Sequence, residues 1–281
     1  MNTVVVVLSD LNYIEKANET VKEIRNPKRG DWKKDIVFIS VDFDLDPSFI
    51  EKYFIIEKKF PRVDISELQK KILNKGYSNS DGREFDKTVQ WEKIHVFDEY
   101  FKSWDKIIYF DVRFSIYDKI EYLEDVDCKN AFVAPNNSGY DDRGNKENKN
   151  FWDIIEKENY KEDVKLLFSQ FGDIENEINK NYFCNCMFIF DTQILNKINK
   201  TEIIEYINKY PVWRSNEMSI MNFFIITKYN IYKELPSRNK NNKYLFIWCE
   251  YDLQNTTFYD YCYVKYSYNS KFSNNENIID F

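Results

Sequence analysis

Short apolar runs that alternate with helical segments are the feature that most constrains the fold of this chain. Residues 3–8, 35–41 and 107–110 are rich in Val, Ile, Phe and Tyr, and polar residues follow each run. Uninterrupted apolar runs of this length are typical of strands buried on both faces. After the first run, apolar residues keep a helical spacing as far as Arg25. The alternation predicts an α/β fold with a mixed, mostly parallel sheet flanked by helices.

The rest of the chain continues this pattern within one domain. We expect further strands at residues 54–56, 131–134, 182–190, 229–235, 244–248 and 259–265, and helices at 65–73, 88–101, 151–180, 194–209 and 217–227. The helix at 88–101 should be amphipathic, and the polar loop at 135–150 is a candidate mobile lid. One domain over residues 1–266 and a polar tail at 267–281 are therefore expected.

Charge and hydropathy exclude several classes of protein. The 281 residues include 40 Lys and Arg against 47 Asp and Glu, for a net charge of −7. An acidic chain is a poor general binder of nucleic acid. No apolar run approaches the ~20 residues of a membrane span, and residues 1–8 lack the basic segment and cleavage site of a signal peptide. We expect a cytoplasmic protein with no membrane span and no nucleic-acid partner.

The histidine and cysteine content narrows the chemistry further. His95 is the only histidine, so catalytic triads and metal sites built on histidine have almost nothing to work with, and its expected role is structural. The five cysteines form no C-x-x-C and are expected to be reduced and buried. Cys184 and Cys186 would share one face of a strand, but two thiols without a second pair make a poor zinc site.

Asp111, Val112 and Arg113 stand at the carboxyl end of the run 107–110. If the chain stays extended there, the side chains of Asp111 and Arg113 leave on the same side. Ligands of open α/β sheets bind in the crevice beyond the carboxyl ends of the strands, where charges need polar partners. This strand end is therefore a candidate binding site, the alternative being a solvated Asp and Arg.

Five segments, taken in order, carry a resemblance to a known family. They read VVVVLSDLNY (4–13), WEK (91–93), WDKIIYFDVR (104–113), YFCNCMFIFDT (182–192) and RSNEMSIMN (214–222). Their order and spacing resemble those of the GT-A glycosyltransferases, nearest to the glycogenin-like, retaining family 8 group and its viral relatives. The resemblance implies a GT-A, Rossmann-like fold, with a nucleotide-binding half at about residues 1–134 and an acceptor half at about 135–266.

The resemblance also implies an activity. A hexosyltransferase-like enzyme would move a hexose or N-acetylhexosamine from a nucleotide sugar, with UDP the favoured nucleotide, to an acceptor hydroxyl, with retention at the anomeric carbon. The acceptor, whether glycan, protein or small molecule, stays open, as does a homodimer. The amino-acid bias is typical of an AT-rich genome and fits a large DNA virus, which would place the protein in the host cytoplasm or the virion.

Roles for particular residues follow from the resemblance. Residues at the end of the first strand and in the next turn would hold the base and ribose: Leu8, Ser9, Asp10 and Tyr13. Residues that would meet the rest of the donor are Lys93, Asp111, Val112, Arg113, Lys265 and Lys271. Three polar residues fall where the family places groups that touch the sugar or the acceptor: Asn185, Asn216 and Glu217. Glu217 would be a base or would stabilise positive charge on the reacting sugar.

Each of these residues also has a structural interpretation. Asp10 is an equally good N-cap for the following helix, and Tyr13 suits the core. Arg113 would make a surface salt bridge, and Asn185 would be satisfied at a strand end. Glu217 is a favourable residue for the first turn of a helix.

Two departures from the family pattern bear on the metal. The second Asp of the family motif, a Mn²⁺ ligand, is Arg113 here, and no histidine follows His95 to supply the C-terminal ligand. Asp111 would then be almost the only protein ligand left, which is too few to bind Mn²⁺ or Mg²⁺. Arg113 could instead bind the diphosphate with its planar fork. The hypothesis is a metal-independent transferase, and the alternative is a catalytically inactive nucleotide-sugar-binding protein.

Overall fold

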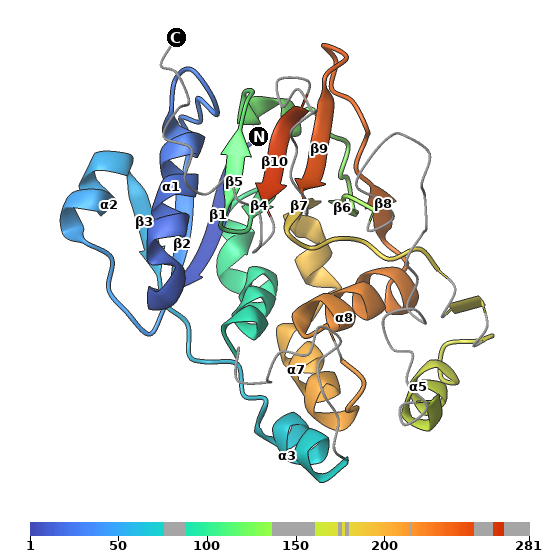
Figure 1. Ribbon diagram of the computed structural model, residues 1–281. Coiled ribbons are helices and arrows are strands. Elements are labelled where there is room, and N and C mark those ends of the chain that lie inside the picture. Colours follow the sequence, from blue (N-terminus) through green and yellow to red (C-terminus); the bar gives the residue numbers. More distant parts are fainter. Residues whose placement is uncertain are drawn as a thin grey trace.

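A seven-stranded mixed sheet lies at the centre of the computed structural model, which describes residues 1–75, 88–136, 161–173, 176–177, 180–213, 215–249 and 261–266 (Figure 1). The strand order is β3-β2-β1-β4-β7-β6-β8. The strands are β1 (Thr3–Asp10), β2 (Ile36–Val41), β3 (Ile55–Lys58), β4 (Lys106–Phe110), β6 (Phe132–Ala134), β7 (Met187–Asp191) and β8 (Tyr232–Glu234). Only β7 runs against its neighbours within this sheet. The predicted mixed, mostly parallel sheet is confirmed.

Both faces of the sheet are buried, which explains the uninterrupted apolar runs. Val4 and Val6 belong to one hydrophobic cluster, whereas Val5 and Val7 belong to the other. All four side chains are fully buried. Successive side chains of a strand point to opposite faces, so each run must be apolar at every position to fill two cores.

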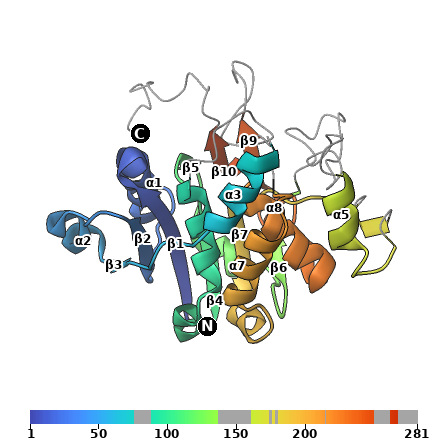
Figure 2. The ribbon, with the colours of Figure 1, turned by 90° about the horizontal axis from the view of Figure 1, so that it is seen from below.

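Different elements cover the two faces. The face with Val5 and Val7 packs against α1 (Ile14–Arg25), α2 (Pro47–Tyr53), η4 (Ile120–Leu123) and the second sheet described below. The opposite face packs against α3 (Ser66–Lys75), η2 (Thr88–Phe97), η3 (Glu99–Ser103), α5 (Lys161–Phe168), η6 (Thr192–Asn196), α7 (Lys200–Lys209), α8 (Glu217–Asn222) and the π-helical η7 (Phe223–Lys228). Figures 1 and 2 both show α2 and α5 at opposite ends of the molecule. No helix among the described residues is long and apolar enough to cross a membrane.

A three-stranded second sheet joins two distant parts of the chain. Its order is β5-β10-β9, with β5 (Phe114–Ile116) antiparallel to β10 (Tyr261–Tyr266), which is parallel to β9 (Tyr244–Cys249). In this register Lys265 lies opposite Phe114. The second sheet therefore brings Lys265 beside the segment that follows β4.

Several elements differ from the sequence predictions. The amphipathic helix expected at 88–101 is two 3₁₀ helices, η2 and η3, and in η2 the polar side chains of Glu92, Lys93 and His95 are as buried as the apolar ones. The reason is that η2 lies among β1, α7 and α8. The strand expected at 182–190 begins only at Met187, and α2 and β5 were not predicted. Most of the expected lid and the tail lie outside the described residues.

Candidate functional site

The candidate site lies where the strand order reverses. The chain passes from β1 outward to β2 and β3, and β4 is then added on the other side of β1. The carboxyl ends of β1 and β4 border the crevice at such a switch point, the usual ligand site of α/β sheets. Because β7 is antiparallel to β4, the residues that precede β7 reach the same edge, where Asp111 N donates to Cys186 O at 2.8 Å.

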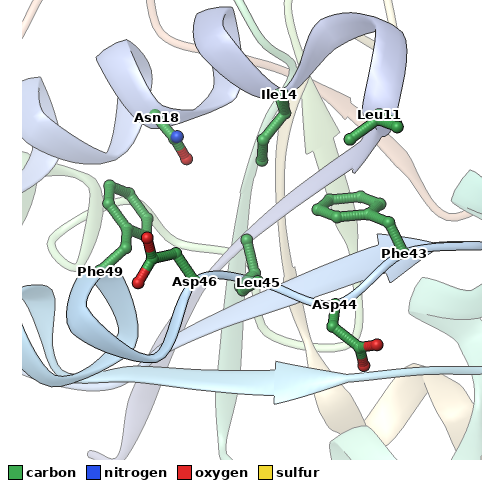
Figure 3. A pocket seen from close by; sticks show the side chains of 8 residues that line it. All are labelled: Leu11, Ile14, Asn18, Phe43, Asp44, Leu45, Asp46 and Phe49. Carbon is green, nitrogen blue, oxygen red and sulfur yellow. The ribbon is translucent and has the colours of Figure 1, made fainter.

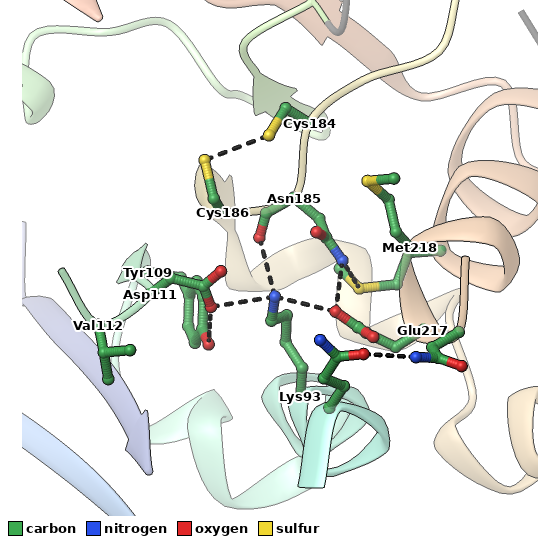
Figure 4. Close-up of polar contacts among 12 residues, drawn as sticks. Lys93, Tyr109, Asp111, Val112, Cys184, Asn185, Cys186, Glu217 and Met218 are labelled. Atoms are coloured by element: carbon green, nitrogen blue, oxygen red, sulfur yellow. Dashed lines mark hydrogen bonds and ion pairs between the residues drawn. The ribbon is translucent and has the colours of Figure 1, made fainter. Parts of the chain in front are cut away.

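An ionic cluster built on Lys93 occupies this edge (Figure 4). Lys93 Nζ lies 3.0 Å from Asp111 Oδ1 and 3.0 Å from Glu217 Oε1. It also donates to the backbone oxygen of Asn185 at 3.3 Å. Three of the residues predicted to form the site thus converge on one ammonium group.

Hydrogen bonds from two uncharged donors complete the cluster. Asn185 Nδ2 donates to Glu217 Oε1 at 3.1 Å, and Tyr109 OH donates to Asp111 Oδ1 at 2.7 Å. The side chains of Lys93 and Glu217 are 5% and 6% exposed, whereas that of Asp111 is 26% exposed. Asp111 is therefore the carboxylate of the cluster that meets solvent.

The electrostatics follow from burial and from the sharing of one cation. Burial lowers the pKa of Lys93, but the carboxylates of Asp111 and Glu217 outweigh this effect and raise the pKa above its ordinary value near 10.5. Burial raises the pKa of Glu217 above its ordinary value near 4.5, and Lys93 offsets part of this rise. Both directions are compatible, because one ammonium faces two carboxylates while Glu217 also feels the charge of Asp111.

The start of α8 is fixed on η2. Asn216 precedes α8 with φ +52° and ψ −133°, a backbone conformation that L-residues rarely adopt. Its side-chain amide donates to Gln90 Oε1 on η2. Gln90 lies three residues before Lys93, which is one turn of a 3₁₀ helix. The contact therefore holds Glu217, the next residue, toward Lys93.

The segment after β4 turns instead of staying extended. Arg113 has φ +65°, in the left-handed region, so the extended backbone on which the same-side expectation depended is not present. Arg113 instead carries its guanidinium to 5.8 Å from the ring centroid of Tyr13. Val112 contributes its backbone oxygen, which accepts from Lys265 Nζ at 2.6 Å. Burial lowers the pKa of Lys265.

At the end of β1, Asp10 has the structural role of an N-cap. Asp10 Oδ1 accepts from Tyr13 N at 3.1 Å, so Asp10 caps η1 (Leu11–Tyr13), as the structural interpretation predicts. Ser9 and Leu8 are buried. Tyr13 is half-buried, with the guanidinium of Arg113 5.8 Å from the centroid of its ring. Lys271 lies outside the described residues.

Sequence reasoning missed Tyr109 and Gln90. Tyr109 lies two residues before Asp111, so strand alternation could have placed both side chains on one face. No sequence signal pointed to Gln90, because its partner Asn216 is 126 residues away. His95 is structural, as predicted: it stacks on Phe60 with centroids 4.5 Å apart, and its Nε2 lies 2.9 Å from Glu92 Oε2.

The residues of the site do not fit a divalent metal ion. Asp111 Oδ1 already accepts from Lys93 and Tyr109. The cation Arg113 stands where the sequence resemblance would place a second Asp as metal ligand. In the described part of the chain, no three His, Cys, Asp or Glu side chains form a group that could hold a metal. Cys184 and Cys186, with sulfurs 3.2 Å apart, remain a pair without further ligands in that part.

A hollow of about 190 Å³ lies between α1 and the segment that leads into α2 (Figure 3). Ile14, Leu45 and Phe49 give it apolar walls. The carboxylate of Asp46 already caps α2 by accepting from Ser48 N at 2.8 Å. The hollow shares no lining residue with the Lys93 cluster.

Comparisons with known proteins bear on the fold. No family model and no curated protein matches the sequence. Among solved structures, the galactosyltransferase LgtC in complex with donor and acceptor sugar analogs matches with a TM-score of 0.54 and 11% identity, over 87% of this chain and 75% of LgtC. The bifunctional glycosyltransferase WbbM in its apo form matches with a TM-score of 0.57 and 12% identity, over 96% of this chain and 46% of WbbM.

A third solved structure, core-mannan synthase A (CmsA/Ktr4) from Aspergillus fumigatus in its Mn/GDP form, matches with a TM-score of 0.52 and 10% identity. The match covers 84% of this chain and 73% of core-mannan synthase A. At sequence identities this low, the similarity shows a shared backbone fold and not a shared reaction. The chain has the GT-A fold that these glycosyltransferases share, as predicted.

Proposed function

We propose that this protein is a glycosyltransferase that moves a sugar from a nucleotide-linked donor to an acceptor hydroxyl. The observation that carries the proposal is the convergence of Lys93, Asp111, Asn185 and Glu217 at the switch point of a GT-A fold. These residues come from four separate segments, and no packing need of a hydrophobic core explains an ionic cluster there. Perturbed, partly exposed charge in a crevice is typical of functional sites.

The donor would bind across the ends of β1 and β4. Tyr13 would offer its ring to the base, and Arg113, whose guanidinium lies 5.8 Å from the centroid of that ring, would bind the diphosphate. Lys265 adds a second cation beside Val112. A UDP donor, membership of the glycogenin-like group, retention at the anomeric carbon and a viral source stay predictions from the sequence.

The chemistry needs positive charge at the leaving group and negative charge near the sugar. As the bond between the anomeric carbon and the diphosphate oxygen breaks, charge grows on the nucleoside diphosphate, and Arg113 and Lys265 would stabilise it without a metal ion. The Glu217 carboxylate would stabilise positive charge on the sugar or accept the proton of the acceptor hydroxyl. Burial raises its pKa, which makes this carboxylate a stronger base than a solvated one.

Thermal stabilisation by nucleotides and nucleotide sugars tests the proposal. We expect one donor to raise the melting temperature equally in EDTA and in Mn²⁺, and to be consumed when acceptors are supplied. Arg113→Ala should weaken donor binding by about tenfold or more, since it removes charge-assisted hydrogen bonds. Arg238→Ala is the matched control, because Arg238 also lies over a tyrosine ring, 3.6 Å from the centroid of Tyr244.

The outcomes separate the alternatives. Binding without sugar transfer or donor hydrolysis would indicate the catalytically inactive nucleotide-sugar-binding protein. Stabilisation that requires Mn²⁺ would contradict the metal-independent mechanism. No response to any donor would refute the transferase proposal as a whole.

A further inference from the structure

The ammonium of Lys93 has no hydrogen-bond donor left for a ligand. A lysine ammonium carries three N–H groups and no acceptor. The cluster supplies three acceptors at 3.0, 3.0 and 3.3 Å, namely Asp111 Oδ1, Glu217 Oε1 and Asn185 O. With its side chain 5% exposed, Lys93 is committed to the protein, which differs from the donor-binding role expected from the sequence.

The three oxygens around Lys93 Nζ are the ligands that a hard cation prefers. Mg²⁺ and Ca²⁺ take carboxylate and carbonyl oxygens, and here two carboxylates and one carbonyl surround a single point. The two carboxylates come from the end of β4 and the start of α8. Without a cation between them, the buried carboxylate of Glu217 and the partly exposed one of Asp111 would repel, which favours protonation of one of them.

We propose that Lys93 is the resident cation of this site and takes the place that a divalent metal ion would otherwise fill between Asp111 and Glu217. Lys93 is then a positioning residue: it holds Glu217 ionised and oriented and joins α8 to β4. Its importance for catalysis rests on the proposed function, but the exclusion of a metal ion does not. The protein's independence of metal would then result from Lys93 as well as from Arg113, which stands where the family motif has its second Asp.

Removal of the Lys93 side chain should create a binding site for Mn²⁺. Lys93→Ala should leave a cavity lined by two carboxylates and a carbonyl, and should bind Mn²⁺ at least tenfold more tightly than the wild-type protein. The double variant Lys93→Ala/Glu217→Gln should return to the wild-type level. Titration of nucleotide-free protein with Mn²⁺, followed by water-proton relaxation and by melting temperature, measures the binding.

Lys106→Ala is the matched control. Lys106 is also buried, but its Nζ donates to the backbone oxygens of Glu124 at 2.7 Å and Val126 at 2.9 Å. Loss of this lysine leaves no carboxylate pair at that position, so no Mn²⁺ binding should appear.

Two results would overturn the proposal. One is a folded Lys93→Ala variant that binds Mn²⁺ no better than wild type. The other needs no Lys93 variant: Mn²⁺ binding by the wild-type protein that Asp111→Asn removes would show that metal and lysine share the site. Because no nucleotide is present, failure here is distinct from failure of the donor-binding experiment.

Discussion

Replacement of Lys93 by methionine should destabilise the fold strongly. Methionine is unbranched and fills irregular space well, so the main effect is the loss of the charge. Removal of one partner from a buried ion pair typically costs about 3–5 kcal/mol, because the other charge is left uncompensated. Asp111 is partly exposed whereas Glu217 is buried, so we expect a loss of free energy of unfolding near the lower end, about 3 kcal/mol.

The loss should depend on pH in a defined direction. The pKa of Glu217 is raised in the folded protein, so the folded state holds this proton more tightly and stability falls as pH rises from about 4.5 through the folded pKa. Without Lys93 the pKa rises further, and the falling range extends upward. The penalty of Lys93→Met should therefore be largest near neutral pH and shrink toward about pH 5. The pKa of Lys93 is itself raised, so its own contribution is fully present throughout this range.

Urea denaturation followed by tryptophan fluorescence measures both effects. The double variant Lys93→Met/Glu217→Gln should recover part of the loss, with a coupling free energy of roughly 0.5–3 kcal/mol. Lys106→Met is the control for this substitution, with a penalty that does not change over this pH range. A pH-independent penalty for Lys93→Met, with additive effects in the double variant, would refute the electrostatic reasoning.

Three further substitutions test single contacts by the same denaturation assay. Tyr109→Phe removes the 2.7 Å hydrogen bond to Asp111 and should cost about 1.5–3 kcal/mol; a neutral effect would mean that solvent replaces the hydroxyl. Asn216→Gly should be more stable than Asn216→Ala by roughly 1–3 kcal/mol, because glycine adopts φ +52° freely, and equal stabilities would contradict the strained backbone. Phe54 ends α2 at φ +51° and is 79% exposed, so Phe54→Gly should stabilise the protein by about 1 kcal/mol; a destabilised variant would show that Phe54 packs.

The fold was largely predictable because its main strands carry local signals. The first apolar run reads as a strand buried on both faces, and β1 is one. By contrast, β5 has three residues and pairs with β10, which is about 150 positions later in the sequence, so its strand conformation depends on a partner that local propensity does not reveal. The burial of η2 on all sides likewise comes from its neighbours and not from its own periodicity.

Four residues of the ionic cluster could be named from the sequence, but their geometry could not. Motif order identified Lys93, Asp111, Asn185 and Glu217, yet nothing in the sequence indicated that one ammonium joins the two carboxylates. The turn at Arg113 was missed because no glycine marks its left-handed backbone. Contacts that depend on side-chain direction and on strained backbone conformations cannot be predicted from local sequence.

The second sheet also affects the order in which the protein can assemble. Lys265 and Val112, which it brings together, are 153 residues apart, and Lys93 and Asn185 are 92 residues apart. Contacts between such distant residues require the closure of long loops and form slowly. During synthesis the N-terminal strands emerge and fold first, and the crevice acquires Lys265 only after β10 has left the ribosome. A nascent chain that has already built β1 and β4 would therefore lack the contact between Lys265 and Val112 until β10 docks.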